Sequence, residues 1–259
     1  MTLIDNESNL AKNYIFDKDK DGLVELTLKN AALAEAIFKN DSRYSKSEDI
    51  NNGPKGKFHG TAAYWITQLS DILLKNNNLS ADGYDYKTCL ENTINAIDRE
   101  NSTHLNADKA GRGEILNRIL KISKINKNDL IQSLKYPQNN NYDLIVTINK
   151  EIKIPGVSKK GRENFSFATK FCHFMCFYLF KGQPEQDNFS IYDNVLAEAI
   201  PKYYKKYCGK KLTISKVQEK DYDKYIGYID EIRKCAKEKH HEEISRNAFD
   251  HLLWFNHKD

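Results

Sequence analysis

The sequence predicts a mainly α-helical protein. Apolar residues recur at intervals of three and four along most of the 259-residue chain, which is the spacing of one face of an amphipathic helix. Helical and strand-like segments do not alternate, so the pattern does not favour a parallel α/β fold. Apolar residues form 40% of the chain and charged residues 29%, proportions that suit a packed core under a charged surface.

The N-terminal half begins with an arm and continues as a series of helices. Residues 1 to about 30 are polar with short apolar runs, which is typical of an arm or a small hairpin. Glycines and a proline at 53–60 predict a loop. Helical patterns are expected at 33–38, from Thr61 to about 73, at 90–97, at 115–125 after a loop containing Gly111 and Gly113, and at 129–134.

The C-terminal half has one ambiguous segment and three clear helical regions. Residues 144–148 fit either a strand or a helix, because β-branched side chains compete with the short spacing. A helix at about 168–181 is apolar almost all round and should therefore be buried. Asp193 occupies the N-cap position of a helix from Asn194, and a last helical region is expected at 222–254.

Targeting signals and cysteine usage indicate a cytoplasmic protein. No apolar run reaches 18 residues, and the N-terminus lacks the basic and apolar regions of a secretory signal. We therefore expect no membrane partner. The five cysteines are scattered and odd in number, which fits a reducing compartment rather than a disulfide framework.

Basic residues concentrate in two tracts, although the formal net charge is only +4. Such tracts suit either a phosphate backbone or a solvated lysine face. The first tract contains Lys150, Lys153, Lys159, Lys160, Arg162 and Lys170, and the second contains Lys202, Lys205, Lys206, Lys210, Lys211, Lys216 and Lys220.

Two motifs resemble metal sites, but we expect no bound metal. Residues 17–22, DKDKDG, match the opening of an EF-hand calcium loop, yet Leu28 stands at position 12 where a carboxylate is needed. A charged surface turn explains this segment better. Cys172, His173 and Cys176 lie close together within an apolar helix, so buried free cysteines are favoured over zinc ligands.

Residues 150–207 hold the pattern with the clearest functional meaning. The run 154–157, IPGV, precedes a basic stretch, Lys170 opens the apolar helix, and Asp193 caps the next helix 23 residues later. This order resembles the helix-hairpin-helix DNA glycosylase superfamily, in particular its 8-oxoguanine DNA glycosylase-like branch. In that family a P-G-V-type hairpin leads to a lysine at the start of a helix and then to a helix-capping aspartate.

The resemblance implies catalytic roles for Lys170 and Asp193. The hairpin residues Gly156, Ser158, Lys159 and Lys160 would bind the DNA backbone, with Ser158 replacing the second glycine of the family hairpin. A direct alignment of 155–160 onto that hairpin would make Lys160 the nucleophile instead. We prefer Lys170 because the apolar helix begins there, whereas a glycine follows Lys160.

A flipped base needs an aromatic-lined pocket, for which Phe249 and Trp254 are candidates beside Phe255. The resemblance implies a two-lobed helical fold with a cleft between the lobes. One lobe would comprise residues 61–187 with the hairpin, and the other residues 1–60 and 188–259. Lys170 and Asp193 would face each other across that cleft.

The function implied by the resemblance is base excision repair. We expect a monomeric, cofactor-independent DNA N-glycosylase, with or without lyase activity, that removes a damaged purine from double-stranded DNA. A lysine amine would attack the sugar, and a carboxylate would stabilise the positive charge that develops on it. The alternative is a non-enzymatic helical module that binds nucleic acid or protein through its lysine-rich faces.

Overall fold

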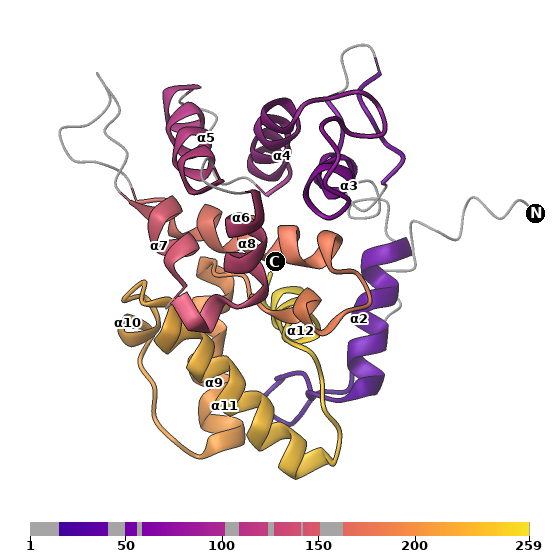
Figure 1. The fold of residues 1–259 in the computed structure, drawn as a ribbon. Helices are drawn as coiled ribbons and strands as arrows, with labels where there is room; N and C mark the ends of the chain where they lie inside the picture. The colour runs from indigo at the N-terminus through magenta and orange to yellow at the C-terminus, as the bar shows by residue number, and fades with distance from the viewer. Residues whose placement is uncertain are drawn as a thin grey trace, which may run out of the picture. The chain divides into compact units, whose positions relative to one another are not determined.

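The computed structural model describes residues 16–40, 50–55, 59–101, 109–123, 127–140, 142–150 and 163–258. Helices dominate these ranges (Figure 1), and the β-structure within them is limited to two isolated bridges, Lys18–Val24 and Leu79–Asp85. The prediction of a mainly α-helical protein is confirmed. The chain divides into two units, which are Lys46–Phe189 and the pair of segments Met1–Ser45 and Ser190–Asp259.

The unit of residues 46–189 is built around helix α8. This helix contacts α3, α4, α6 and α7 and carries fully buried side chains such as Phe167, Phe171 and Met175. The helices of the unit are α3 (Ala62–Leu73), α4 (Tyr86–Glu100), α5 (Lys109–Ser123), α6 (Lys127–Lys135), α7 (Asp143–Asn149) and α8 (Phe165–Leu179), with the 3₁₀ turns η3 (Pro137–Asn140) and η4 (Pro184–Asp187).

The other unit brings the segment 16–40 together with the C-terminal helices. Helix α9 packs against α11 and α12, and α12 packs against α2. The large side chains of Tyr203, Tyr225 and Phe249 are fully buried there. The helices of this unit are α2 (Leu28–Asn40), α9 (Asn194–Cys208), α10 (Ile214–Val217), α11 (Tyr222–His240) and α12 (Arg246–His257).

Local sequence signals account for several helix ends. Side chains of Thr61, Asp85, Asp193 and Ser245 accept hydrogen bonds from N–H groups of the first turn of α3, α4, α9 and α12, respectively. Helix α9 ends at Gly209, whose φ of 66° is a conformation that glycine adopts without strain. The predicted start of this helix at Asn194 is confirmed.

The structure changes two local expectations and decides one that the sequence left open. Gly111 and Gly113 lie inside α5, so the loop predicted around them is wrong. Residues 144–148 form part of helix α7 rather than a strand. Helix α8 begins at Phe165, three residues before the expected start near 168. None of the described helices is long and apolar enough to cross a membrane.

Candidate functional site

Lys170 lies in the second turn of α8, as its sixth residue, and is partly buried. Its Nζ donates a hydrogen bond of 3.3 Å to the main-chain oxygen of Asn101. Asn101 is the C-cap of α4, where the helix dipole carries partial negative charge. The contact favours the charged ammonium, whereas nucleophilic attack needs the neutral amine. The positive end of the α8 dipole acts within the first turn and so gives Lys170 little help.

Helices α7 and α8 pack against each other and are separated in sequence by residues 150–164. Leu144, Ile145 and Ile148 form the buried side of α7. Arg118 Nη1 donates a hydrogen bond of 2.6 Å to the carbonyl of Lys150, directly after α7. The chain therefore has a packed helix on each side of the predicted hairpin. The predicted DNA-binding residues Gly156, Ser158, Lys159 and Lys160 lie outside the described residues.

Asp193 is the N-cap of α9, as expected from the sequence. Its Oδ1 accepts a hydrogen bond of 2.8 Å from the backbone N–H of Leu196, and its own backbone is extended. The side chain is partly exposed. The carboxylate therefore lies at the N-terminal end of α9, the end that attracts negative charge.

The residues directly before Asp193 are held by buried polar side chains. The Tyr222 hydroxyl accepts from the Ser190 N–H at 2.8 Å and donates to the Ser190 carbonyl at 2.9 Å. The Tyr225 hydroxyl donates to the Ile191 carbonyl at 2.6 Å, and Asp250 Oδ2 accepts from the Ile191 N–H at 2.8 Å. Burial raises the pKa of Tyr225 well above its usual range. These contacts fix the backbone that leads into Asp193.

Sequence reasoning missed these supporting residues. The one available signal was the pair of tyrosines in the first turn of α11, which an amphipathic pattern alone assigns to the core. Asp250 stands in the middle of α12, where nothing in the sequence distinguishes it from a surface acid. Its partner, Ile191, is 59 residues away in the chain.

Lys170 and Asp193 belong to different units of the chain. Their convergence on one cleft stays a prediction. The immediate surroundings of the two side chains are nevertheless distinct, because Lys170 is bonded to a helix C-terminus and Asp193 to a helix N-terminus.

The two candidate pocket residues differ in accessibility. The Phe249 ring is fully buried and packs edge-on against Tyr203, with ring centroids 6.5 Å apart. A ring in that position fills the core and is not available for stacking on a base without rearrangement. Trp254 is partly exposed, and Lys258 Nζ lies 3.8 Å from the centre of its ring. Of the two, Trp254 is the one that an added base could reach.

The second basic tract divides into engaged and exposed lysines. Lys206 forms ion pairs with Asp19 and Glu25, and Lys210 pairs with Glu231 at 2.5 Å. Four others are exposed on α9 and the segment after it, namely Lys202, Lys205, Lys211 and Lys216. We call these four the lysine face of α9–α10.

The thiols of α8 are part of the core. Cys172 and Cys176 are buried free cysteines, as predicted, and burial raises the pKa of both thiols well above the usual range. His173 is also buried, with Nδ1 2.8 Å from the Phe189 carbonyl oxygen. Within the described ranges, no group of three or more His, Cys, Asp or Glu side chains is placed to hold a metal ion.

A separate pocket of about 340 Å³ lies between α4 and α5. Arg112 Nη1 donates to Asn95 Oδ1 at 3.0 Å along its wall. None of the predicted site residues contributes to its lining, which consists of Glu91, Ile94, Asn95, Arg112, Gly113 and Leu116.

Comparisons of the chain with protein-family models, with curated proteins and with solved structures gave no match.

Proposed function

We propose that this protein excises a damaged purine from double-stranded DNA, with Lys170 as the nucleophile and Asp193 as the carboxylate that stabilises the sugar cation. The observation that carries the proposal is the packed pair α7 and α8, which flanks the sequence containing the P-G-V run. A helix-hairpin-helix needs a helix on each side of its hairpin, and the residues before the hairpin were ambiguous in sequence. The lysine lies on the second helix of the pair.

The proposed chemistry begins with attack of the neutral Nζ on the anomeric carbon. The glycosidic bond breaks, its electron pair leaves with the base, and the base takes up the proton lost by the attacking amine. Opening of the sugar ring then yields an imine between the lysine and the sugar. Asp193 would stabilise the positive charge on the sugar and relay the proton.

Lys170 must first release its hydrogen bond to the Asn101 carbonyl. The Asn101 carbonyl at the C-terminus of α4 favours the protonated form of the amine. We therefore place the loss of this hydrogen bond and the loss of the proton in the same step. We propose that insertion of the flipped nucleotide displaces the side chain from Asn101 and surrounds it with apolar groups that favour the neutral amine.

Borohydride trapping tests the proposal. Wild-type protein incubated with duplexes carrying an abasic site or an oxidised purine should form a covalent adduct, and Lys170→Gln should abolish it while DNA binding changes little. Lys181→Gln is the matched control, because Lys181 is exposed just after α8 and should not affect trapping. Loss of the adduct in Lys160→Gln alone would transfer the nucleophile to the hairpin. Absence of any adduct with wild-type protein would reject a lysine nucleophile.

A second candidate function is a non-catalytic module that binds nucleic acid. The observation that favours it is the exposed lysine face of α9–α10, made by Lys202, Lys205, Lys211 and Lys216. Neutralising phosphates with such a face releases counterions and gives salt-dependent binding without sequence preference. Salt-dependent binding to duplexes together with no excision and no trapped adduct would select this function.

A further inference from the structure

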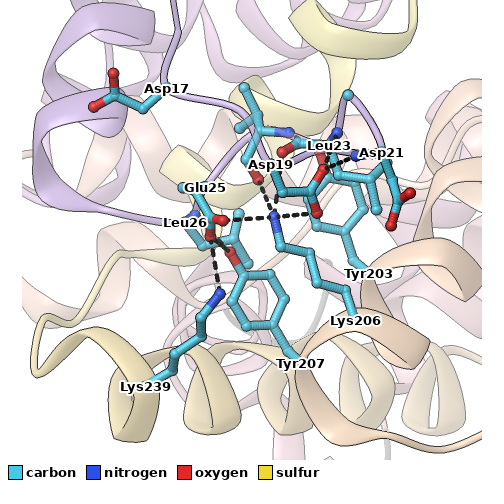
Figure 2. A network of polar contacts seen from close by, with 12 residues as sticks. Asp17, Asp19, Asp21, Leu23, Glu25, Leu26, Tyr203, Lys206, Tyr207 and Lys239 are labelled. Carbon is cyan, nitrogen blue, oxygen red and sulfur yellow. Dashed lines mark hydrogen bonds and ion pairs between the residues drawn. The ribbon is translucent and has the colours of Figure 1, made fainter.

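The calcium-type turn of residues 17–25 lies against helix α9 (Figure 2). In an EF-hand loop numbered from Asp17, the ligand positions 3, 7 and 9 are the Asp19 side chain, the Leu23 carbonyl and the Glu25 side chain. Gly22 stands at position 6 with a φ of 76°, as the tight turn requires. The turn thus has part of the ligand pattern of a cation loop.

All three of these ligand positions contact the Lys206 Nζ. The ammonium lies 3.0 Å from Asp19 Oδ2, 3.2 Å from Glu25 Oε1 and 3.2 Å from the Leu23 oxygen, and the Val24 oxygen follows at 3.4 Å. Only 9% of the Lys206 side chain is exposed. An ammonium has three N–H donors, so the three shorter contacts satisfy it completely.

We propose that the Lys206 ammonium is the resident cation of this loop, taking the place that a calcium ion would have in an EF-hand. The positive charge is supplied by the chain itself. The loop therefore closes without a metal and joins the segment 16–27 to α9.

The remaining acids of the motif are directed elsewhere. Figure 2 shows the carboxylates of Asp17 and Asp21 pointing away from the Lys206 ammonium. Asp17 pairs with Lys29 at 2.8 Å. Calcium takes six to eight oxygen ligands, and in the natural turn Lys206 occupies the centre where such an ion would be bound.

Neighbouring side chains reinforce the arrangement at Glu25. Its Oε2 accepts a hydrogen bond of 2.8 Å from the Tyr207 hydroxyl and lies 3.1 Å from His240 Nε2. Tyr207 also accepts from the Leu26 N–H at 2.9 Å, and Lys239 Nζ lies 3.4 Å from Glu25. Burial alone would raise the pKa values of Asp19 and Glu25, but the contacts with Lys206 and, for Glu25, with Tyr207 hold both below their usual range.

Substitution of Lys206 tests the role of its charge. Lys206→Met keeps the apolar stem but leaves two largely buried carboxylates without their cation, so the thermal midpoint should fall by on the order of 10 °C. The triple variant Lys206→Met, Asp19→Asn, Glu25→Gln should recover most of that loss, because the carboxylates are then neutral. Lys210→Met is the charge-matched control, since the Lys210 side chain is 63% exposed and its ion pair contributes little.

Two outcomes of that series would overturn the proposal. One is a midpoint for Lys206→Met equal to that of Lys210→Met. The other is a triple variant no more stable than the single one, which would show that the lysine matters through packing and not through charge. If Lys206→Met does not fold, the triple variant still distinguishes these explanations.

Calcium provides the second test. Millimolar calcium should leave the midpoint of the wild-type protein unchanged and raise that of Lys206→Met, because the vacated loop then has oxygen ligands without a cation. Magnesium, which requires a smaller octahedral site, should raise it less. A midpoint of Lys206→Met that does not respond to calcium, or a wild-type midpoint that rises with it, would contradict the assignment.

Discussion

Asp193 combines a structural role with a proposed chemical one, and one substitution separates them. Asparagine caps a helix about as well as aspartate, because its amide oxygen can accept the same hydrogen bond from Leu196. It cannot stabilise a sugar cation with a full negative charge. The two roles of Asp193 therefore respond differently to the change from carboxylate to amide.

Asp193→Asn should leave the thermal midpoint within a few degrees of wild type and reduce excision by about 10²–10³-fold, as removal of one electrostatic interaction with a transition state does. Single-turnover excision of an oxidised purine measures this. Asp221→Asn is the control, because Asp221 caps α11 in the same unit through a bond to the Lys224 N–H. Unchanged excision in Asp193→Asn would remove this residue from the proposed mechanism.

At the scale of elements, the lysine face of α9–α10 is the proposed contact for a phosphate backbone. The second basic tract contains seven lysines, but two of them, Lys206 and Lys210, already form ion pairs with acidic side chains. A lysine paired with a carboxylate gains less from a phosphate, because the existing ion pair must be broken first. Five lysines of the tract remain, and the four that make up the lysine face of α9–α10 are the ones to change.

Replacement of Lys202, Lys205, Lys211 and Lys216 by glutamine should weaken duplex binding and flatten the dependence of log K on log salt, by up to about 0.9 for each phosphate that is no longer neutralised. Fluorescence anisotropy at several salt concentrations measures both. A set of four exposed lysines elsewhere, Lys55, Lys87, Lys121 and Lys181, serves as the charge-matched control. An equal reduction of duplex affinity in both sets of variants would indicate a diffuse effect of net charge and not a binding face.

At the scale of the whole molecule, the depressed carboxyl pKa values among the described residues concentrate in one unit. Asp19, Glu25, Glu231 and Glu243 all have lowered pKa values there, whereas Asp85 does so in the unit of residues 46–189. A carboxyl with a lowered folded-state pKa adds stability that is present above its unfolded pKa. That stability is lost as the pH falls through the folded pKa.

Acidification from pH 6 to about 3 should therefore destabilise the unit that contains Asp19 and Glu25 more than the other. Trp254 is the one tryptophan of the unit that contains Asp19 and Glu25, and Trp65 is that of the other unit, so their fluorescence reports the two units separately. In Trp65→Phe only Trp254 remains, and its signal reports the unit that contains Asp19 and Glu25. In Trp254→Phe only Trp65 remains, and its signal reports the unit of residues 46–189. The thermal midpoint should fall further with acidification in the first variant than in the second. Parallel falls would mean that these carboxylates do not set the acid response.

The sequence alone was sufficient for the helical class and for most helix positions, because these depend on local signals. The start of α9 follows from Asp193, and the buried helix α8 follows from its continuous apolar run. Local signals were misleading at Gly111 and Gly113, where packing of Ile115 and Ile119 into the core outweighs the low helix propensity of glycine. They were indecisive at 144–148.

Only the tertiary structure decided which polar groups meet. Lys206 contacts residues more than 180 positions earlier in the chain, and Asp250 binds a backbone group 59 positions earlier. Lys170 was expected at a helix N-terminus and instead donates to the C-terminal end of α4. Periodicity and capping report the conformation of neighbouring residues, whereas contacts of this kind arise when distant segments are packed together and their buried polar groups must be paired.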